Sequence, residues 1–97
     1  MARVVITGIG AVTPVGNDAE STWDALKAGR SGVGPITTFD TSSYPVKIGG
    51  MCDQFDADRA LVRSPVNRYL HRAERFGVAA ATEALVSAGI EPGGGVG

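Results

Sequence analysis

The stretch MARVVITGIGAVTPVGN, residues 1–17, decides the fold predicted for this chain. Its apolar, β-branched run Val4–Ile6 is typical of a strand buried on both faces, as strands are in a parallel sheet. Three glycines and a proline follow between residues 7 and 16, so the strand must end in a shaped loop. Asn17 then stands where the N-cap of a helix is expected. We therefore predict a strand–loop–helix unit that the rest of the chain covers or extends.

Composition excludes several classes of function. The chain has 97 residues with a formal net charge of −1, so no global field favours nucleic acid or an anionic membrane. No apolar run approaches the roughly 20 residues that span a bilayer, and no secretory signal is expected at the N-terminus. Cys52 is the single cysteine, which excludes an internal disulfide and suits a reducing cytosol. With a single histidine, the chain also lacks a zinc site of the usual spacing, and we expect a cytoplasmic protein.

A first helix is predicted over residues 18–28. Asn17 and Glu20 stand in capping-box register, and Gly29 follows as a C-cap. Trp23 falls on the apolar face of this helix, where we favour core packing over a role as a ligand platform. The helix is therefore expected to cover the first strand.

Residues 29–45 are predicted to form a long irregular segment, and a short strand is predicted over residues 46–51. We expect Ile36, Phe39 and Tyr44 to pin the irregular segment to the body of the protein. A functional loop is the alternative, because loops of this length often carry function.

Two further helices complete the prediction. Asp56 can cap a short one over residues 57–62, and Ser64 followed by proline starts a long one over residues 65–88. Apolar residues recur along one stripe of the long helix at Val66, Tyr69, Ala73, Phe76, Ala80, Ala84 and Ala88. Residues 78–81 carry little side-chain bulk, so another backbone can approach closely there. Such a helix is typical of the interior of a larger protein, and we expect residues 1–97 to be the incomplete N-terminal part of a domain.

Two patterns that could carry chemistry are weak. Gly8 and Gly10 begin a dinucleotide-binding fingerprint, but Thr13 stands where its third glycine is required. Cys52 could act as a nucleophile with His71 as its base, although the adjacent Asp53 disfavours a thiolate. We favour an incidental cysteine and a surface histidine, and we predict no cofactor.

Basic residues gather in the second predicted helix, just after it and in the first half of the third. They are Arg59, Arg63, Arg68, Arg72 and Arg75. The last three lie at three- and four-residue steps, so they are expected to share one helix face. A solvated face or a subunit contact is one reading of this cluster, and docking of an acidic partner is the other.

Together these segments resemble the β-ketoacyl-acyl-carrier-protein synthases, and most closely the elongating type II enzymes of bacterial fatty-acid synthesis. Residues 3–17 resemble the opening strand and loop of that family, and residues 21–33 resemble its first helix and following Gly-x-Ser-Gly turn. Residues 39–42 are similar to the next loop, and residues 79–89 to the long helix. The resemblance covers almost the whole chain in order and spacing.

The resemblance implies an α/β, thiolase-like fold of which this chain forms the N-terminal portion: a βα unit, a long loop and a long buried helix. It implies a homodimeric acyltransferase of fatty-acid or polyketide elongation that performs decarboxylative Claisen condensation without a cofactor. A cysteine nucleophile accepts the acyl chain, and two histidines assist decarboxylation and stabilise the oxyanion. None of these catalytic residues matches a position among the 97, so residues 1–97 alone are expected to be inactive.

The resemblance also implies a partner, the acidic acyl carrier protein. Basic residues near the start of the long helix help to dock it in the resembling enzymes, and Arg68 matches such a position with Arg63 close by. Two alternatives stay open: a non-catalytic subunit of the chain-length-factor kind, and a free-standing binding module that uses the arginine face. The resemblance implies that acyl-chain length and primer choice are set by pocket residues mostly beyond Gly97.

Overall fold

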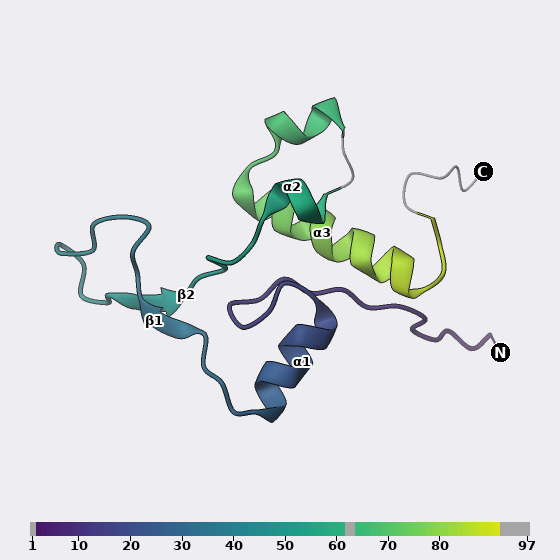
Figure 1. Ribbon diagram of the computed structural model, residues 1–97, viewed down its shortest axis with the longest axis horizontal. Coiled ribbons are helices and arrows are strands. Elements are labelled where there is room, and N and C mark those ends of the chain that lie inside the picture. Colours follow the sequence, from purple (N-terminus) through teal and green to yellow (C-terminus); the bar gives the residue numbers. More distant parts are fainter. Residues whose placement is uncertain (1, 62–63, 92–97) are drawn as a thin grey trace.

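A computed structural model describes residues 2–61 and 64–91 of the chain (Figure 1). The helices are α1 (Ala19–Lys27), α2 (Ala57–Ala60), the 3₁₀ helix η1 (Pro65–Tyr69) and α3 (Arg72–Ser87). The strands are β1 (Val33–Pro35) and β2 (Ile48–Gly50), which pair antiparallel with Gly34 opposite Gly49. The radius of gyration is 16.3 Å, against about 13 Å for a compact domain of this size, so the arrangement is open.

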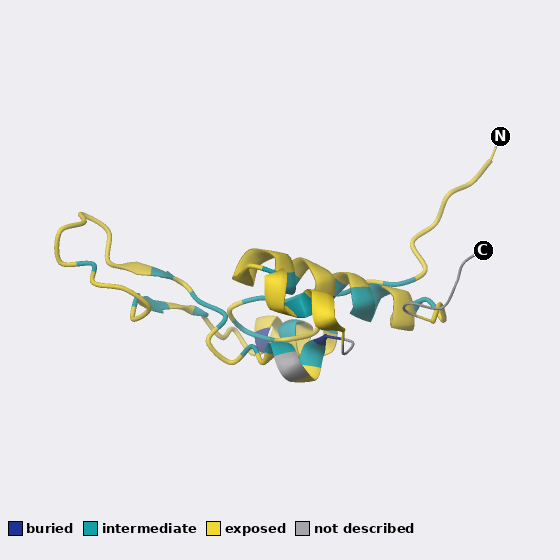
Figure 2. Cartoon of the chain, turned by 90° about the horizontal axis from the view of Figure 1, so that it is seen from above, coloured by how far each residue is buried: buried dark blue, intermediate teal, exposed yellow. Residues whose placement is uncertain are grey.

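Few side chains are withdrawn from solvent in this open arrangement (Figure 2). Among the described residues, the buried apolar positions are Ala25 on α1, Leu61 after α2 and Ala79 on α3. Trp23 is 59% exposed, so the core packing predicted for it is wrong for this chain. The small Ala25 of the same helix is buried instead, at 2% exposed. No helix in the described ranges is long and apolar enough to cross a bilayer.

The N-terminal segment differs from its prediction. Residues 4–6 form no strand, and the side chains of Val4 and Ile6 are 93% and 84% exposed. A strand needs a neighbour for its backbone hydrogen bonds, and within the described residues the only sheet is the β1–β2 pair. The buried strand predicted over Val4–Ile6 is therefore absent.

Farther along, the same segment runs beside α3 (Figure 1). A Cβ at Gly8 would collide with the carbonyl oxygen of Ala84, and one at Gly10 with the carbonyl oxygen of Ala80. The predicted close approach of another backbone to the small-residue stripe of the long helix is therefore confirmed. Glycine is required at both positions because a side chain would not fit against α3. Its backbone freedom is not the reason, since neither residue has a positive φ.

Helix α1 begins one residue later than predicted. Asp18 is its N-cap, and one of its carboxylate oxygens accepts a hydrogen bond from the backbone N–H of Ser21 at 2.7 Å. Asn17, the predicted cap, instead donates from Nδ2 to the carbonyl of Gln54 at 2.7 Å. The predicted box between Asn17 and Glu20 is therefore wrong, because the carboxylate of the next residue takes the capping position.

Both long helices end in the same way. Gly29 follows α1 with a φ of 72°, and Gly89 follows α3 with a φ of 81°. After α1, the N–H groups of Gly29 and Arg30 donate to the carbonyls of Leu26 and Ala25. The two residues after α3 form the same two hydrogen bonds at the same spacings. This is the Schellman arrangement, in which a left-handed residue turns the chain back on the last turn. The predicted helix ends at Gly29 and Gly89 are confirmed.

The strands β1 and β2 form a hairpin that projects away from α3 (Figures 1 and 2). β2 lies within the predicted strand over residues 46–51, whereas β1 was missed inside the segment predicted as irregular. Phe39 and Tyr44 are 56% and 53% exposed and pack edge-on against each other, with ring centroids 6.0 Å apart. Because they contact each other at the hairpin loop, they do not pin it to the body as predicted.

A lysine organises the loop of this hairpin. The Lys47 ammonium donates to the carbonyls of Thr41, Ser42 and Tyr44 at 3.1, 3.4 and 2.8 Å. Asp40 accepts from the backbone N–H of Ser42 at 2.9 Å. The loop is therefore closed by its own side chains.

The long helix predicted over residues 65–88 is divided in two. Ser64 caps η1 as predicted, but Leu70 adopts an extended ψ of 132°, and α3 begins only after His71. The Glu74 carboxylate accepts from the backbone N–H of His71 at 3.1 Å, which fixes the new helix start. The short helix predicted over residues 57–62 is found as the four residues of α2, and its last predicted residue, Val62, lies outside the described ranges.

Candidate functional site

The predicted docking residues are Arg63 and Arg68. Arg63 lies outside the described ranges. Arg68 occupies the last turn of η1 and is exposed. Its Nη2 donates to the hydroxyl of Tyr69 at 2.7 Å, and its Cζ lies 4.8 Å from the centroid of the same ring. Arg68 therefore keeps its charge at the surface, in contact with an aromatic side chain.

The other arginines near η1 serve the structure. Arg75 donates from Nε to the carbonyl of Leu70 at 3.0 Å and from Nη2 to the carbonyl of Asn67 at 3.3 Å. It thereby supports the break between η1 and α3. Arg72 donates to the carbonyl of Cys52 at 2.7 Å and lies over the ring of Phe76 at 4.9 Å. Arg72 thus uses one of its five N–H donors, and Arg75 two, on carbonyls of this chain.

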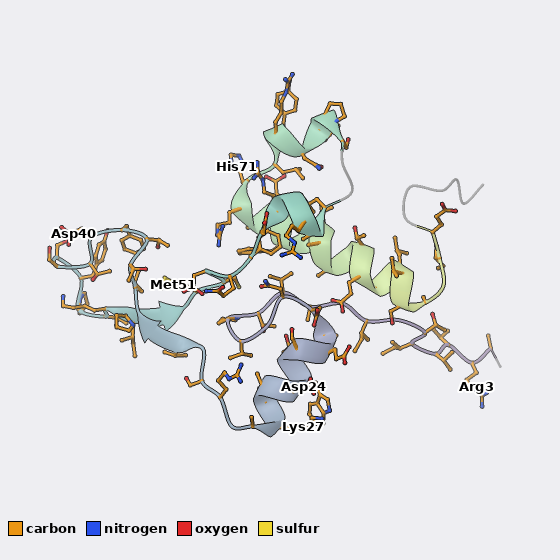
Figure 3. The ribbon with its side chains drawn as sticks, in the orientation of Figure 1. Arg3, Asp24, Lys27, Asp40, Met51 and His71 are labelled. Atoms are coloured by element: carbon orange, nitrogen blue, oxygen red, sulfur yellow. The ribbon has the colours of Figure 1, made fainter. Side chains whose placement is uncertain are left out.

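The predicted common face of Arg68, Arg72 and Arg75 is therefore wrong. Arg68 belongs to η1 and the other two to α3, and the extended Leu70 separates the two helices. His71 stands exposed at this junction, as predicted for a surface histidine (Figure 3).

Two open cavities lie near this region. The larger, of about 550 Å³, is lined by Asp53, Gln54, Phe55, Asp56, Ala57, Arg72 and Arg75. It mixes two carboxylates with two guanidinium groups, so it presents no single sign of charge. The smaller, of about 250 Å³, is bordered by the loop at residues 13–17 and by residues 30–31 and 52–54.

Cys52 borders the smaller cavity as a half-buried free thiol. His71, its only candidate base, caps α3 and is not among the residues that line this cavity. The described residues contain no group of three or more His, Cys, Asp or Glu that could hold a metal ion. The assignment of Cys52 as an incidental cysteine stays a prediction.

Glu83 on α3 has a role that the sequence did not predict. The carboxylate of Glu83 on α3 accepts from the backbone N–H of Ala11 at 2.9 Å and from that of Ala19 at 2.9 Å. Ala19 is the first residue of α1, where the N–H groups lack partners within the helix and the helix dipole favours a negative charge. Glu83 therefore joins the loop, the start of α1 and α3.

The turn at Thr13–Gly16 completes this junction. Thr13 and Gly16 exchange two backbone hydrogen bonds of 2.8 and 3.2 Å across Pro14 and Val15. The Thr13 hydroxyl lies 3.0 Å from that of Thr22 on α1. The turn is thereby attached to the helix that follows it.

Two carboxyl groups have a shifted pKa. Hydrogen bonds from Ser21, first from its side chain and then from its backbone, lower the pKa of Asp18. Hydrogen bonds from Ser42, first from its backbone, lower the pKa of Asp40. Both shifts follow from local caps and turns, so neither marks a catalytic acid or base.

Comparison with known families decides what the chain is. The profile of the family described as "Beta-ketoacyl synthase, N-terminal domain" matches residues 1–95. The chain belongs to this family. A 3-oxoacyl-[acyl-carrier-protein] synthase 2 of Synechocystis is 43% identical over 83 residues, covering 86% of this chain and 20% of that protein.

Two further relatives are a subunit named for a polyketide synthase and a solved ketosynthase/chain length factor. The tetracenomycin polyketide synthase ketoacyl synthase beta subunit of Streptomyces glaucescens is 42% identical over 94 residues, or 94% of this chain and 22% of that protein. Among solved structures, the ishigamide ketosynthase/chain length factor aligns with a TM-score of 0.77 at 35% identity, covering 89% of this chain and 21% of its own. The chain thus spans about a fifth of the length of these relatives, and it has the N-terminal part of an α/β, thiolase-like fold.

Within this β-ketoacyl synthase segment, one signal could have revealed Glu83. It is an acidic residue in a helix stretch that is otherwise small or apolar, from Val78 to Val86. A single carboxylate on a packed helix face needs hydrogen-bond donors, and the free backbone N–H groups at the start of a neighbouring helix supply them. No feature of the sequence indicates the hydrogen bond from the backbone N–H of Ala11 to Glu83.

Proposed function

We propose that the protein containing this chain is a β-ketoacyl-acyl-carrier-protein synthase that elongates acyl chains by decarboxylative Claisen condensation. The observation that carries the proposal is the family match over residues 1–95, with relatives named 3-oxoacyl-[acyl-carrier-protein] synthase 2. We further propose that the full protein is a cytoplasmic homodimer, that it needs no cofactor, and that residues 1–97 are part of a larger domain.

In the proposed reaction, a cysteine thiolate attacks the acyl thioester and releases the carrier thiol. The malonyl thioester then loses carbon dioxide, and its enolate carbon attacks the carbonyl of the enzyme-bound acyl group. The acyl–sulfur bond breaks, the cysteine leaves as a thiolate, and the product is a 3-oxoacyl carrier protein. Two histidines stabilise the developing negative charge. We assign these three residues to the part of the protein beyond Gly97, and we assign no catalytic role to Cys52 or His71.

A condensation assay tests this proposal. The purified full-length protein is incubated with an acyl carrier thioester and malonyl carrier protein, and the 3-oxoacyl product is measured by mass spectrometry. We expect product from the wild type and from Cys52→Ser, because we assign the nucleophile to a cysteine beyond Gly97. Absence of product from the wild type would refute the proposal, and loss of product with Cys52→Ser alone would refute the assignment of the nucleophile.

A second candidate function has its own support. The Streptomyces glaucescens relative is named a beta subunit, and the ishigamide structure is of a ketosynthase/chain length factor. A non-catalytic subunit would have no reactive cysteine beyond residue 97. Peptide mapping after iodoacetamide treatment distinguishes the two functions. A cysteine that reacts fast with iodoacetamide, and that prior acylation protects, supports the enzyme. The absence of such a cysteine supports the subunit.

Carrier docking is the third part of the proposal, and we assign it to Arg63 and Arg68. Arg68 supports it with an exposed guanidinium on η1, a helix without an acidic residue. The double variant Arg63→Glu, Arg68→Glu should raise the KM for the carrier protein at least about tenfold with little change in kcat, because rim charges act chiefly on encounter and binding. Arg30→Glu, which reverses one exposed charge elsewhere, is the control for each single reversal. An unchanged KM in the double variant would remove these arginines from the docking site.

A further inference from the structure

The Lys47 ammonium is matched to the loop that precedes it. An ammonium group has three N–H donors and no acceptor. This one donates to three backbone carbonyls, those of Thr41, Ser42 and Tyr44, and none of them lies more than six residues from the lysine in sequence. The cluster is therefore complete within the loop itself, whatever other part of the protein lies beside it.

Backbone hydrogen bonds alone leave part of this loop without donors. The N–H of Tyr44 donates to the carbonyl of Thr41 at 2.9 Å, which closes a turn. Pro45 follows the turn and has no N–H to donate. Among the described residues, the hydrogen bonds to the carbonyls of Ser42 and Tyr44 come from Lys47. The lysine therefore supplies what the backbone of the loop lacks.

The charge of Lys47 explains why these carbonyls can converge. Carbonyl oxygens that point at one site repel each other, because each carries a partial negative charge. A cation between them replaces this repulsion by attraction, and a charged donor forms stronger hydrogen bonds than a neutral one. In the part of the chain that the structure describes, Lys47 forms no ion pair with a carboxylate. Its charge therefore acts on the loop carbonyls.

We propose that Lys47 is a charge-dependent latch: its ammonium keeps the loop at residues 40–46 closed, and loss of the charge opens the loop. Acylation is the lysine modification that removes the charge. In that reaction the neutral amine attacks an acyl thioester, an N–C bond forms, the C–S bond breaks, and the thiol leaves with the amine proton. The product keeps one N–H, which can serve one of the three carbonyls. The latch does not depend on the proposed function.

Hydrogen exchange of the full-length protein, followed by mass spectrometry of a peptide that spans residues 40–46, tests the latch. Lys47→Gln removes the charge and should raise the exchange rate of the Tyr44 N–H at least about fivefold, because the turn loses the cation that holds its carbonyls together. Acetyl-lysine introduced in place of Lys47 during translation should have the same effect. Lys47→Arg keeps a cation with several donors and should stay within about twofold of the wild type.

Two controls separate the loop from the rest of the chain. Lys27→Gln removes the other lysine, which pairs with Asp24 on α1, and should leave exchange in the loop unchanged. The N–H of Ile36 donates to the carbonyl of Lys47 at 2.9 Å and should stay protected in every variant, since the strands remain paired.

Three results would overturn the latch. Equal exchange in the loop of the wild type and Lys47→Gln would show that the ammonium does not hold it closed. Opening by Lys47→Arg as large as that by Lys47→Gln would show that the charge is not the cause. Loss of protection at Ile36 would show that Lys47 supports the whole hairpin and not its loop alone.

Discussion

Residues 2–6 and 8–16 are separated in the chain by Thr7 alone, yet the structure holds them in different ways. The first stretch contains Val4 and Ile6, which are almost fully exposed. The second contains glycines that touch the backbone of α3, an N–H bonded to Glu83 and a turn attached to α1. The more apolar stretch is the less well held.

The difference shows what fixes a segment in this chain. Apolar side chains stabilise a fold only where other atoms cover them, and nothing described in this chain covers Val4 or Ile6. Backbone groups that meet a helix or a carboxylate are fixed by local geometry instead. The predictions that follow test whether this geometry holds residues 8–16 as the structure implies.

The largest effect is expected from Gly10→Val. Its Cβ would collide with the carbonyl oxygen of Ala80, and backbone atoms on both sides leave little freedom to relax. We expect a loss of more than about 3 kcal/mol in the free energy of unfolding, measured by urea denaturation of the protein that contains this chain. Gly34→Ala is the control, because a Cβ at Gly34 meets nothing within 4 Å. Equal stability of the two variants would show that the loop does not contact α3 in solution.

Next in size is the removal of the Glu83 carboxylate. Glu83→Ala leaves the N–H groups of Ala11 and Ala19 without their acceptor, which should cost about 1–3 kcal/mol. Glu83→Gln keeps one acceptor oxygen and should cost less. Glu20→Gln removes an exposed carboxylate from the first turn of α1 and should stay within about 0.5 kcal/mol of the wild type. A larger cost at Glu20 than at Glu83 would contradict the junction described here.

A smaller, pH-dependent effect is expected at the cap of α1. Asp18→Ala should cost about 1 kcal/mol at neutral pH. Because folding lowers the pKa of Asp18, its stabilising contribution is complete above its unfolded value of about 3.9 and is lost as the pH falls through the lower folded value. The difference between wild type and Asp18→Ala should therefore shrink below about pH 4. Asp18→Asn, a cap that does not titrate, should show no such dependence, and a gap that widens in acid would contradict the cap.

The smallest effect has the opposite sign. Gly77 lies within α3, and a Cβ at this position meets nothing within 4 Å. Gly77→Ala should therefore stabilise the helix by about 0.5–1 kcal/mol, since alanine loses less backbone entropy on folding. Urea denaturation measures it beside Gly10→Val. A destabilised Gly77→Ala would mean that another part of the full protein lies against this face of α3.

Local signals predicted the ends of the helices well. Gly29 and Gly89 were placed correctly because a left-handed residue after a helix is almost a glycine requirement. The start of α3 was missed because the periodic apolar stripe continued through Leu70, and only the pair of His71 and Glu74 marked the new cap. Periodicity records which side chains could share a face, and it does not record whether the backbone between them stays helical.

The candidate site was less predictable than the fold. Helical spacing placed Arg68, Arg72 and Arg75 together, but the extended residue before α3 separates the first from the others. The carbonyl partners of Arg72 and Arg75 lie in neighbouring loops, and no spacing rule reports where a carbonyl will point. Family resemblance selected Arg68, whereas its contact with Tyr69 is seen only in the structure.

The reactivity of the Lys47 amine can report on opening of the β1–β2 hairpin loop. Lys47 and Lys27 are the two lysines of the chain, and their amines have different surroundings. The Lys27 amine stands on the surface of α1 beside Asp24, at 3.3 Å (Figure 3), whereas the Lys47 amine directs its protons at three carbonyls of its own loop. An acylating reagent must first release Lys47 from these acceptors, so Lys27 should be labelled faster. The ratio of the two labelling rates would then measure how often the loop opens.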